Sequence, residues 1–411
     1  MAGVFDLNLR HLRLFSLITK HGGISATARA EGISQPALSQ ALASLEEQFG
    51  TPLFDRAPRG VVLTSGGRTV LGRIDRALTQ FALAFRRLNA APQRKDPQNY
   101  LVSAHVRGLI YLADAGNFMR AAAAARISIP SLHRSVRDLE QLTGIMLVER
   151  RGRGMGLTKA GTQLANGFML AVRELRIALD ETQESGGRVA IGAMALSRSL
   201  LLPTALADLH REFPEAAIDV VEGSYLELAE MLRSGRLDLI VGALREKPVR
   251  DLKQEPLFSD RLTIIGRAGH PIAGVEASFE QLAAYPWIVA RRASGLLERW
   301  QRIFDVAAVA RPKAPVHCGS VALIRGMLAH SDFLTLLSPD QVRAEIDAGT
   351  LTQIRSAVPD TMRTIGTISR SDWHPTRLQK RLMELLREQA AGRTAELLSG
   401  ARRKVGDDDD S

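Results

Sequence analysis

The sequence predicts a multidomain chain in which two tandem α-helical domains, each a winged helix-turn-helix, precede an α/β region. Three observations lead to this prediction. An internal repeat at an offset of 94 residues fills the first part of the chain. From about residue 188, short apolar strands alternate with helices. The net charge is +10, and roughly nine of these surplus positive charges lie in residues 1–185. A basic part joined to a neutral part suggests a polyanion-binding module linked to something else.

The repeat establishes that a unit is duplicated within the chain. About 19 of roughly 61 positions are identical without a gap. Ile33–Leu38 aligns with Ile127–Leu132, and Leu63–Gly67 aligns with Leu157–Gly161. Chance does not produce identity of this extent.

The first copy predicts three helices. An apolar stripe at helical spacing stops at Gly22, and Ser25 can N-cap a second, short helix. Ser34 can cap a third helix that carries Pro36 in its first turn. This third helix turns polar side chains outward, among them Gln35, Ser39 and Gln40. Two short helices joined by a glycine-containing turn form a helix-turn-helix.

A short β-hairpin with a basic tip, or wing, is predicted after the third helix. It spans about residues 53–64 and carries Arg56 and Arg59. A small helical bundle without a nucleic-acid function is the alternative. The polar helix face, the basic wing and the net charge together favour DNA binding over that alternative.

The helix that follows the wing has an apolar stripe spaced like a coiled-coil seam. The residues are Leu71, Ile74, Leu78, Phe81, Phe85 and Leu88. No other predicted element nearby covers this stripe, so we expect a helix of a second chain to bury it, in a homodimer or homotetramer. The second copy ends in a similar but less regular stripe, and residues 90–99 are predicted to be a linker.

These segments resemble a known family. Ser34–Gln40, Leu45–Glu47, Gly50–Arg56 and Leu63–Gly67 resemble the N-terminal winged helix-turn-helix of LysR-type transcriptional regulators. The usual family member has one such domain, so the duplication is a departure from the family pattern. Residues 188–395 are similar to the family's effector-binding domain. We therefore expect DNA-binding copies at 1–90 and 100–185, an effector domain at 188–395, and a flexible charged tail at 396–411.

For the first copy, the resemblance and groove chemistry imply that the third helix enters the major groove of double-stranded DNA. Amide and hydroxyl side chains there reach base edges, while Ser34 and Thr64 meet phosphates and the wing arginines supply charge. The expected positions are Ser25, Ser34, Gln35, Pro36, Ser39, Gln40, Arg56, Arg59 and Thr64.

For the second copy, two hypotheses remain open. Its wing is richer in arginine, with Arg150 and Arg151, and Arg134 and His133 remain available to read bases or phosphates. Ile129 and Met119, however, replace polar residues expected at DNA. Either both copies bind DNA, or the second copy is a dimerisation and linker scaffold that retains general phosphate affinity.

The alternation of strands and helices after residue 188 predicts a parallel sheet covered on both faces. The resemblance implies an α/β two-lobed domain like that of periplasmic solute-binding proteins. Lobe I is expected at about 188–261 and 368–395, and lobe II at about 262–367. The two crossovers are placed near 262–266 and 365–369.

Ligands in open α/β sheets bind beyond the carboxyl ends of strands, against helix N-termini. This rule gives the candidate effector residues Met194, Ser197, Arg198, Leu244, Arg291, Ser294, Gly295, Ser320 and Val321. Any one of the serines is as well explained as a helix cap, and only their convergence favours a site. The arginines favour a small or aromatic carboxylate. Residues 331–342 are similar to a family branch linked to sugar uptake and aromatic-acid metabolism, which leaves a sugar open.

Other functions have little support in the sequence. No HExxH, GxSxG or P-loop motif is present, so we expect no enzyme, and we expect no metal or cofactor. The single cysteine, Cys318, excludes an intrachain disulfide and is expected to be buried and structural. A solute-binding protein without DNA function is disfavoured by the N-terminus, which lacks signal-peptide features, and by the basic first part. The expectation is a cytoplasmic regulator with no membrane contact, for which RNA polymerase is a candidate partner.

Overall fold

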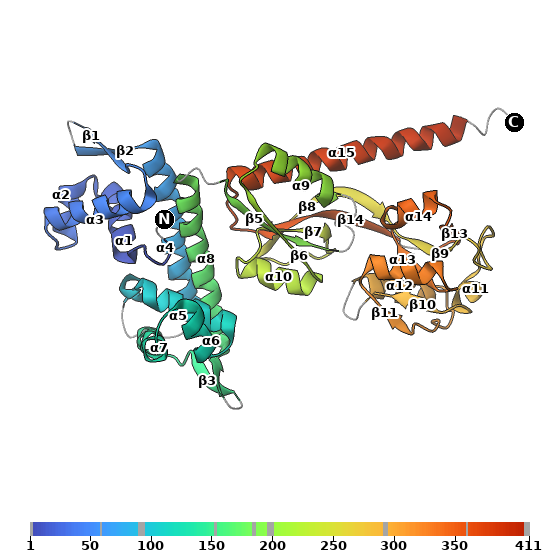
Figure 1. Cartoon of the computed structure of the whole chain (residues 1–411), viewed down its shortest axis with the longest axis horizontal. Helices are drawn as coiled ribbons and strands as arrows, with labels where there is room; N and C mark the ends of the chain where they lie inside the picture. The colour runs from blue at the N-terminus through green and yellow to red at the C-terminus, as the bar shows by residue number, and fades with distance from the viewer. Residues whose placement is uncertain are drawn as a thin grey trace. The chain divides into compact units, whose positions relative to one another are not determined.

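The computed structural model describes residues 3–57, 60–88, 95–151, 154–182, 186–194, 201–290, 295–358 and 361–406. Within these ranges, the side chains of Arg56, Ala57, Arg151 and residues 393–406 lie outside the description. The chain divides into two compact units (Figure 1). The first comprises Met1–Gly187 with Arg233–Arg236, and the second comprises Arg188–Leu232 with Leu237–Ser411.

The first copy of the repeat folds as three helices, a hairpin and a long helix. In chain order these are α1 (Leu9–His21), α2 (Ile24–Ala30), α3 (Gln35–Phe49), β1 (Phe54–Ala57), β2 (Gly60–Leu63) and α4 (Ser65–Arg86). Gly22 ends α1 in the left-handed region at φ 78°, where a residue without a side chain is least strained. Ser34 caps α3, because its Oγ accepts a hydrogen bond from the backbone N–H of Ala37 at 3.3 Å.

After one additional short helix at its start, the second copy has the same element order. It contains η1 (Pro97–Tyr100), α5 (Ser103–Ala115), α6 (Phe118–Ala125), α7 (Ile129–Thr143), β3 (Val148–Arg151), β4 (Gly154–Leu157) and α8 (Lys159–Thr182). Sequence identities between the copies correspond to shared contacts. Gly67 and Gly161 each pass a backbone carbonyl so closely that an added Cβ would stand 2.0 Å and 2.2 Å from it, respectively. This pair of identical glycines therefore marks a position where the close approach of the backbone leaves no room for a side chain.

The apolar stripe of α4 is buried by α8 of the same chain. Ile74, Phe81 and Phe85 are buried, and the Phe81 ring meets the Phe168 ring edge-on at 5.5 Å between centroids. Both copies share one continuous hydrophobic core. The expectation that a second chain would cover this stripe was wrong, because the less regular stripe of the second copy lies against it.

The second unit contains two five-stranded sheets. The first sheet has the order β6-β5-β7-β14-β8, in which β5 pairs in parallel with β6 and β7, while β14 runs antiparallel to β7 and β8. Its strands are β5 (Arg188–Ala193), β6 (Ala217–Glu222), β7 (Leu239–Ala243), β8 (Leu252–Arg261) and β14 (Met362–Arg370), and its helices are α9 (Leu201–Glu212), α10 (Tyr225–Arg233) and α15 (Arg377–Gly406). Leucines of α9 and α15 pack on this sheet in one core.

The second sheet has the order β11-β10-β12-β9-β13. Its strands are β9 (Thr263–Arg267), β10 (Trp287–Val289), β11 (Val316–His317), β12 (Leu334–Leu337) and β13 (Leu351–Ile354). The accompanying helices are α11 (Phe279–Ala283), α12 (Gly295–Val306), α13 (Val321–Ala329), η2 (Pro339–Val342) and α14 (Arg343–Asp347). Its core contains three aromatic rings in mutual tilted or edge-on contact, those of Trp287, Trp300 and Phe304.

Two boundaries differ from those expected. The whole of β14 pairs in the first sheet from Met362 onward, so the chain returns to that sheet before the expected crossover at 365–369. The backbone of α15 is helical to Gly406, whereas a flexible tail was expected from residue 396. Alanine, leucine, arginine and glutamate dominate this stretch, and these are strong helix formers. Among the described residues, no helix is long and apolar enough to cross a membrane.

Candidate functional site

The exposed face of α3 carries the predicted reading residues. Leu38, Leu42 and Leu45 point into the core, which leaves Gln35, Pro36, Ser39 and Gln40 exposed on the opposite side. None of these four side chains is charged. Such a surface can make specific hydrogen bonds to base edges, but it contributes little general attraction to phosphate.

Three predicted hydroxyl residues have structural roles. Gly23, rather than Ser25, is the N-cap of α2, because the helix begins two residues earlier than expected. Ser25 instead donates a hydrogen bond from Oγ to Oε1 of Gln35 at 3.3 Å and is exposed beside α3. Ser34 is exposed at the start of α3 as its cap. The Thr64 hydroxyl caps α4 and donates to the carbonyl of Pro52 at 2.6 Å, so its proton is already used within the fold.

The wings are described in part. Arg56 lies in β1, with its backbone opposite Val61, and its side chain is outside the described residues. Arg59 is also outside them. Arg150 in β3 is exposed, whereas the Arg151 side chain is outside the described part.

The exposed face of α7 is basic. Arg134 is exposed as predicted, and Arg137, one turn further along the same helix, is exposed as well. Neither guanidinium has an ion-pair partner within the described ranges. His133 is half-buried and its ring stacks on Phe118 at 4.0 Å, so it is held by packing rather than free to read a base. Sequence reasoning missed Arg137, although the 94-residue offset places it at exposed Ala43 of α3.

On the first sheet of the α/β unit, the predicted effector positions lie at strand ends. Met194 follows β5, and its side chain packs against the backbone of Gly242. An added Cβ on Gly242 would stand 2.5 Å from that side chain. Leu244 follows β7, is half-buried, and donates its N–H to the carbonyl of Thr364 at 2.9 Å. Ser197 and Arg198 lie outside the described residues.

On the second sheet, the predicted positions lie at helix starts. Gly295 is the first residue of α12, and Ser320 caps α13 by accepting from the N–H of Leu323 at 3.4 Å, next to half-buried Val321. Arg291 and Ser294 lie outside the described residues. Cys318 is half-buried rather than buried, because it lies just past β11 and its Sγ accepts from the N–H of Ser320 at 3.3 Å.

Arg245 is a candidate effector contact that sequence reasoning missed. Its backbone N–H and C=O are both held by the Gln254 side chain, and its guanidinium carbon lies 4.5 Å from the centre of the Tyr225 ring. Its Nη1 also lies 3.7 Å from where a Cβ on Gly295 would stand. Arg245 therefore reaches from the end of β7 to the start of α12. Within the described part, this guanidinium has no carboxylate partner.

The described residues also contain a cavity of about 350 Å³ away from these strand ends. It lies in the first unit and is lined by residues of α1, α4 and the segment around η1. It matches none of the expected effector positions. No group of three or more metal-ligating side chains occurs within the described ranges.

Comparison with known proteins gives a consistent result. The chain matches the family model described as bacterial regulatory helix-turn-helix protein, lysR family, over residues 9–68 and again over 104–162. It matches the model of the LysR substrate binding domain over residues 182–391. The HTH-type transcriptional regulator GalR of Pseudomonas putida is 28% identical over 369 residues, which cover 89% of this chain and 92% of that protein.

A shorter relative and a solved structure match in a similar way. The HTH-type transcriptional regulator PcaQ of Agrobacterium fabrum is 28% identical over 294 residues, 70% of this chain and 94% of that protein. The structure of a full-length OxyR variant from Pseudomonas aeruginosa has a TM-score of 0.50 and 22% identity. It covers 70% of this chain and 93% of that one, and it supports the fold alone.

Proposed function

Because the chain belongs to the LysR family of transcriptional regulators, we propose that it binds an operator through two tandem winged helix-turn-helix domains. We further propose that a small carboxylate or a sugar, bound in the α/β unit, changes that binding. Promoter-bound RNA polymerase is the partner through which such a change would alter transcription. The family consists of regulators rather than enzymes.

The observation that supports DNA reading is the division of α3 into a buried apolar face and an exposed amide-bearing face. Gln35 and Gln40 carry the side-chain type that can bond an adenine through both N6 and N7 in the major groove. The preceding α2 supplies Ser25, whose hydroxyl contacts Gln35 and restrains its orientation. The first unit of the chain thus presents an ordered set of hydrogen-bonding groups on a protruding helix.

The observation that supports effector binding is Arg245. A half-buried guanidinium without a carboxylate partner among the described residues is an incomplete ion pair, and a ligand carboxylate would complete it bidentately. The Tyr225 ring holds the guanidinium from one face, which leaves its edge free to form such bonds. The start of α12 at Gly295 adds a helix N-terminus, which favours negative charge. These features favour a carboxylate over a sugar.

DNA reading is tested by selecting preferred duplexes from a random pool with the unaltered chain and with Gln40→Ala. The variant should lose base preference at one position of the selected site while retaining its binding to random duplex. Glu47→Ala is the matched control, because Glu47 is exposed on the same helix two turns further from its start. Identical selected sequences for all three proteins would contradict the proposal for α3.

Effector binding is tested with benzoate, succinate and glucose as probes of three ligand classes. One of the two carboxylates should raise the melting temperature of the chain, and Arg245→Gln should abolish that increase without changing DNA affinity in the absence of ligand. A glucose-dependent increase that survives Arg245→Gln would contradict the carboxylate assignment and support a sugar.

A further inference from the structure

We propose that the DNA-binding unit is a single-chain pseudo-dimer. In this arrangement, α4 pairs with α8 of the same chain, and a buried ionic cluster of Arg73, Glu174 and Glu181 excludes the pairing of α4 helices from two chains. One chain then presents two unlike reading helices, α3 and α7, to one DNA site. The pairing is argued from the packing of α4 and α8, whereas the presentation of two reading helices to one DNA site rests on the proposed function.

The two long helices run antiparallel with an approximate two-fold relationship. Phe81 faces Phe168, and Ala84 faces Gly167. At an offset of 94, Phe168 is the equivalent of Ile74 and Gly167 is the equivalent of Arg73. In repeat-equivalent numbering, position 81 thus faces position 74, and position 84 faces position 73. Antiparallel helices related by a two-fold axis make contacts of this kind, in which residues on one side of the axis face residues on the other side. The centre of the pair falls near two equivalent and fully buried alanines, Ala77 and Ala171.

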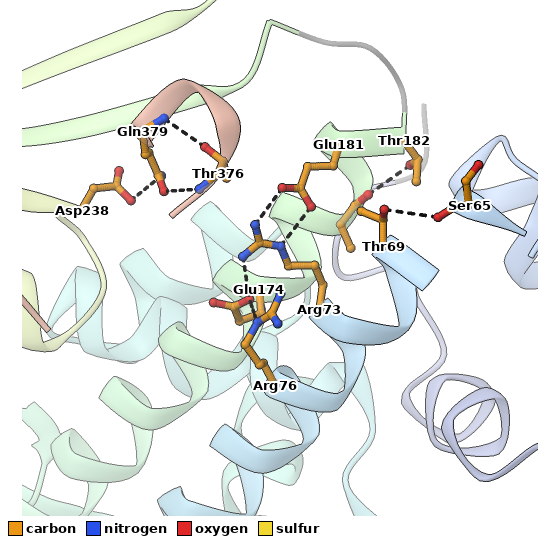
Figure 2. Close-up of polar contacts among 11 residues, drawn as sticks. Ser65, Thr69, Arg73, Arg76, Glu174, Glu181, Thr182, Asp238, Thr376 and Gln379 are labelled. Atoms are coloured by element: carbon orange, nitrogen blue, oxygen red, sulfur yellow. Dashed lines mark hydrogen bonds and ion pairs between the residues drawn. The ribbon is translucent and has the colours of Figure 1, made fainter. Parts of the chain in front are cut away.

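Charge breaks this symmetry at one end of the pair. The Arg73 side chain donates from Nε and Nη2 to both carboxylate oxygens of Glu181, at 3.0 Å and 2.7 Å, and from Nη1 to Glu174 at 3.2 Å (Figure 2). Arg76 adds a contact from Nε to Glu174 at 3.0 Å. Arg73 is only 5% exposed and Glu174 only 7%. Burial lowers the pKa of Arg73, but the hydrogen bonds and charges of Glu181 and Glu174 outweigh it, so that the pKa lies above its ordinary value.

The equivalent positions show what two identical helices would bring together. Glu174 and Glu181 of α8 correspond to Gln80 and Arg87 of α4. If α4 paired with α4 of a second chain in this register, Arg73 would face a glutamine and an arginine, once at each end of the pair. A buried guanidinium with no carboxylate and a nearby like charge is strongly unfavourable. The α4–α8 pair is the combination that supplies the acids.

Side-chain volume gives the same preference at the opposite end. An added Cβ at Gly167 would stand 2.4 Å from the Cβ of Ala84, so the helices touch there and leave no room for a side chain. Two α4 helices would bring Arg73 to this position. Two α4 helices could therefore not approach each other at this end as closely as α4 and α8 do.

Antiparallel pairing places the two winged units at opposite ends of the helix pair (Figure 1). The side-chain amide of Gln163 donates to the carbonyl of Arg87 at 2.9 Å, which sets the register. Along the helix pair, Ser65 at the start of α4 lies 22 residues before Arg87, and Lys159 at the start of α8 lies about four residues beyond the Arg87–Gln163 contact. The two helix starts are therefore separated by about 26 residues, or about 39 Å at about 1.5 Å per residue. This separation is close to the roughly 34–36 Å between successive major-groove segments on one face of DNA. The helix pair is therefore long enough to hold the two winged helix-turn-helix copies about one turn of DNA apart.

The two reading faces differ in chemistry. Gln40 of α3 corresponds to Arg134 of α7, and exposed Ala43 corresponds to exposed Arg137. Glutamine pairs best with adenine, and arginine pairs best with guanine. We therefore expect an asymmetric site with one arm read through amides and the other through guanidinium groups.

The pairing is tested by cross-linking the full chain in a Cys318→Ser background. In an Arg87→Cys/Gln163→Cys chain, a short bismaleimide should form an intrachain link that migrates as a monomer on a denaturing gel. The matched control is Thr69→Cys/Arg87→Cys, because Thr69 is the repeat equivalent of Gln163. Its two cysteines lie about 27 Å apart on one helix, at about 1.5 Å per residue, and would meet only between two paired α4 helices. The control should give no cross-linked dimer. A dimer band from either chain would overturn the proposal.

The consequence for DNA is tested by mixing defective chains. Gln35→Ala/Gln40→Ala removes the α3 contacts, Arg134→Ala/Arg137→Ala removes the α7 contacts, and each should weaken binding to the selected site by tenfold or more. If both reading helices belong to one chain, co-expressing the two variants should not restore affinity. Restored affinity would show that two chains contribute one helix each. An unchanged footprint for the α7 variant would show that the second copy is a scaffold and would overturn the proposal that α7 reads DNA. If neither variant had an effect, the proposed function would be contradicted, while the cross-linking result on the helix pairing would still hold.

Discussion

Replacement of Arg73 by methionine should destabilise the first unit of this regulator by about 3 kcal/mol, because breaking a buried ion pair on one side typically costs about 3–5 kcal/mol. The lower end of that range applies because part of the cluster can recover. Glu181 is 26% exposed at its side chain and can regain water, and Glu174 keeps its contact with Arg76. Methionine fills most of the volume of the arginine stem, so the loss reports charge rather than a cavity.

The matched control is Arg76→Met. Arg76 binds the same carboxylate of Glu174, but its side chain is 32% exposed, and Arg73 remains to neutralise the acid. Its replacement should cost about 1 kcal/mol or less, as expected for a partly solvated pair. The two variants therefore remove the same charge from the same helix at different depths.

Hydrogen exchange followed by mass spectrometry is the suitable assay, because peptides from α4 and α8 report the first unit alone. A loss of about 3 kcal/mol accelerates exchange of their most protected amides by about a hundredfold, at about 1.4 kcal/mol per factor of ten. All three tryptophans, Trp287, Trp300 and Trp373, belong to the second unit, so their fluorescence should not change. Equal exchange in the Arg73 and Arg76 variants would refute the reasoning, since it would mean that the Arg73 cluster is as well hydrated as a surface pair.

Three further predictions concern packing, pH and a buried carboxylate. Gly167→Ala should destabilise the first unit by about 1–3 kcal/mol, because the facing helix leaves no space for a side chain there. Gly72→Ala is the control, since an added Cβ meets only a flexible side chain, and it should stabilise the unit by up to about 1 kcal/mol. Hydrogen exchange of α4 and α8 measures both effects. Burial lowers the pKa of His270 below its ordinary value of 6.5, so the unfolded chain binds the proton more readily, and stability measured by tryptophan fluorescence should fall as pH decreases from 7.5 to 5.5. That dependence should be smaller in His270→Asn, which does not titrate. Asp238→Ala should lower the stability of the second unit by about 3 kcal/mol because it leaves the buried side-chain amide of Gln379 without its acceptor (Figure 2), and an unchanged denaturation midpoint would contradict this.

Local features of this chain were predictable because local sequence determines them. Ser34 caps α3 as expected, and the polar face of that helix follows from its periodicity. The predicted N-cap of α2 was wrong by two residues, because Gly23 adopts a positive φ of 145°, which favours glycine, and α2 starts directly after it. Such errors at helix ends arise where two residues close together in the sequence can both serve as a cap.

Features that depend on distant segments were not predictable in the same way. The stripe on α4 was correctly identified as apolar, but periodicity does not say which helix covers it. Arg73 lies beside that stripe and looks like an ordinary solvated arginine until Glu174 and Glu181, about a hundred residues later, are placed against it. Arg245 was missed for the same reason, since its significance depends on Tyr225 and on the start of α12 at Gly295.

The proposed use of α3 and α7 as unlike reading helices and the unlike charges of α4 and α8 would have a common physical consequence. In a dimer of identical chains, a substitution in the reading helix changes both arms of the DNA site together. When both helices belong to one chain, Gln40 and Arg134 can differ, so the two arms can have different sequences. The covalent connection also gives the second arm a high effective concentration once the first is bound. This advantage is lost if α4 exchanges partners between chains, and the Arg73 cluster opposes that exchange. Oligomers of this regulator should therefore form through surfaces other than the α4 seam.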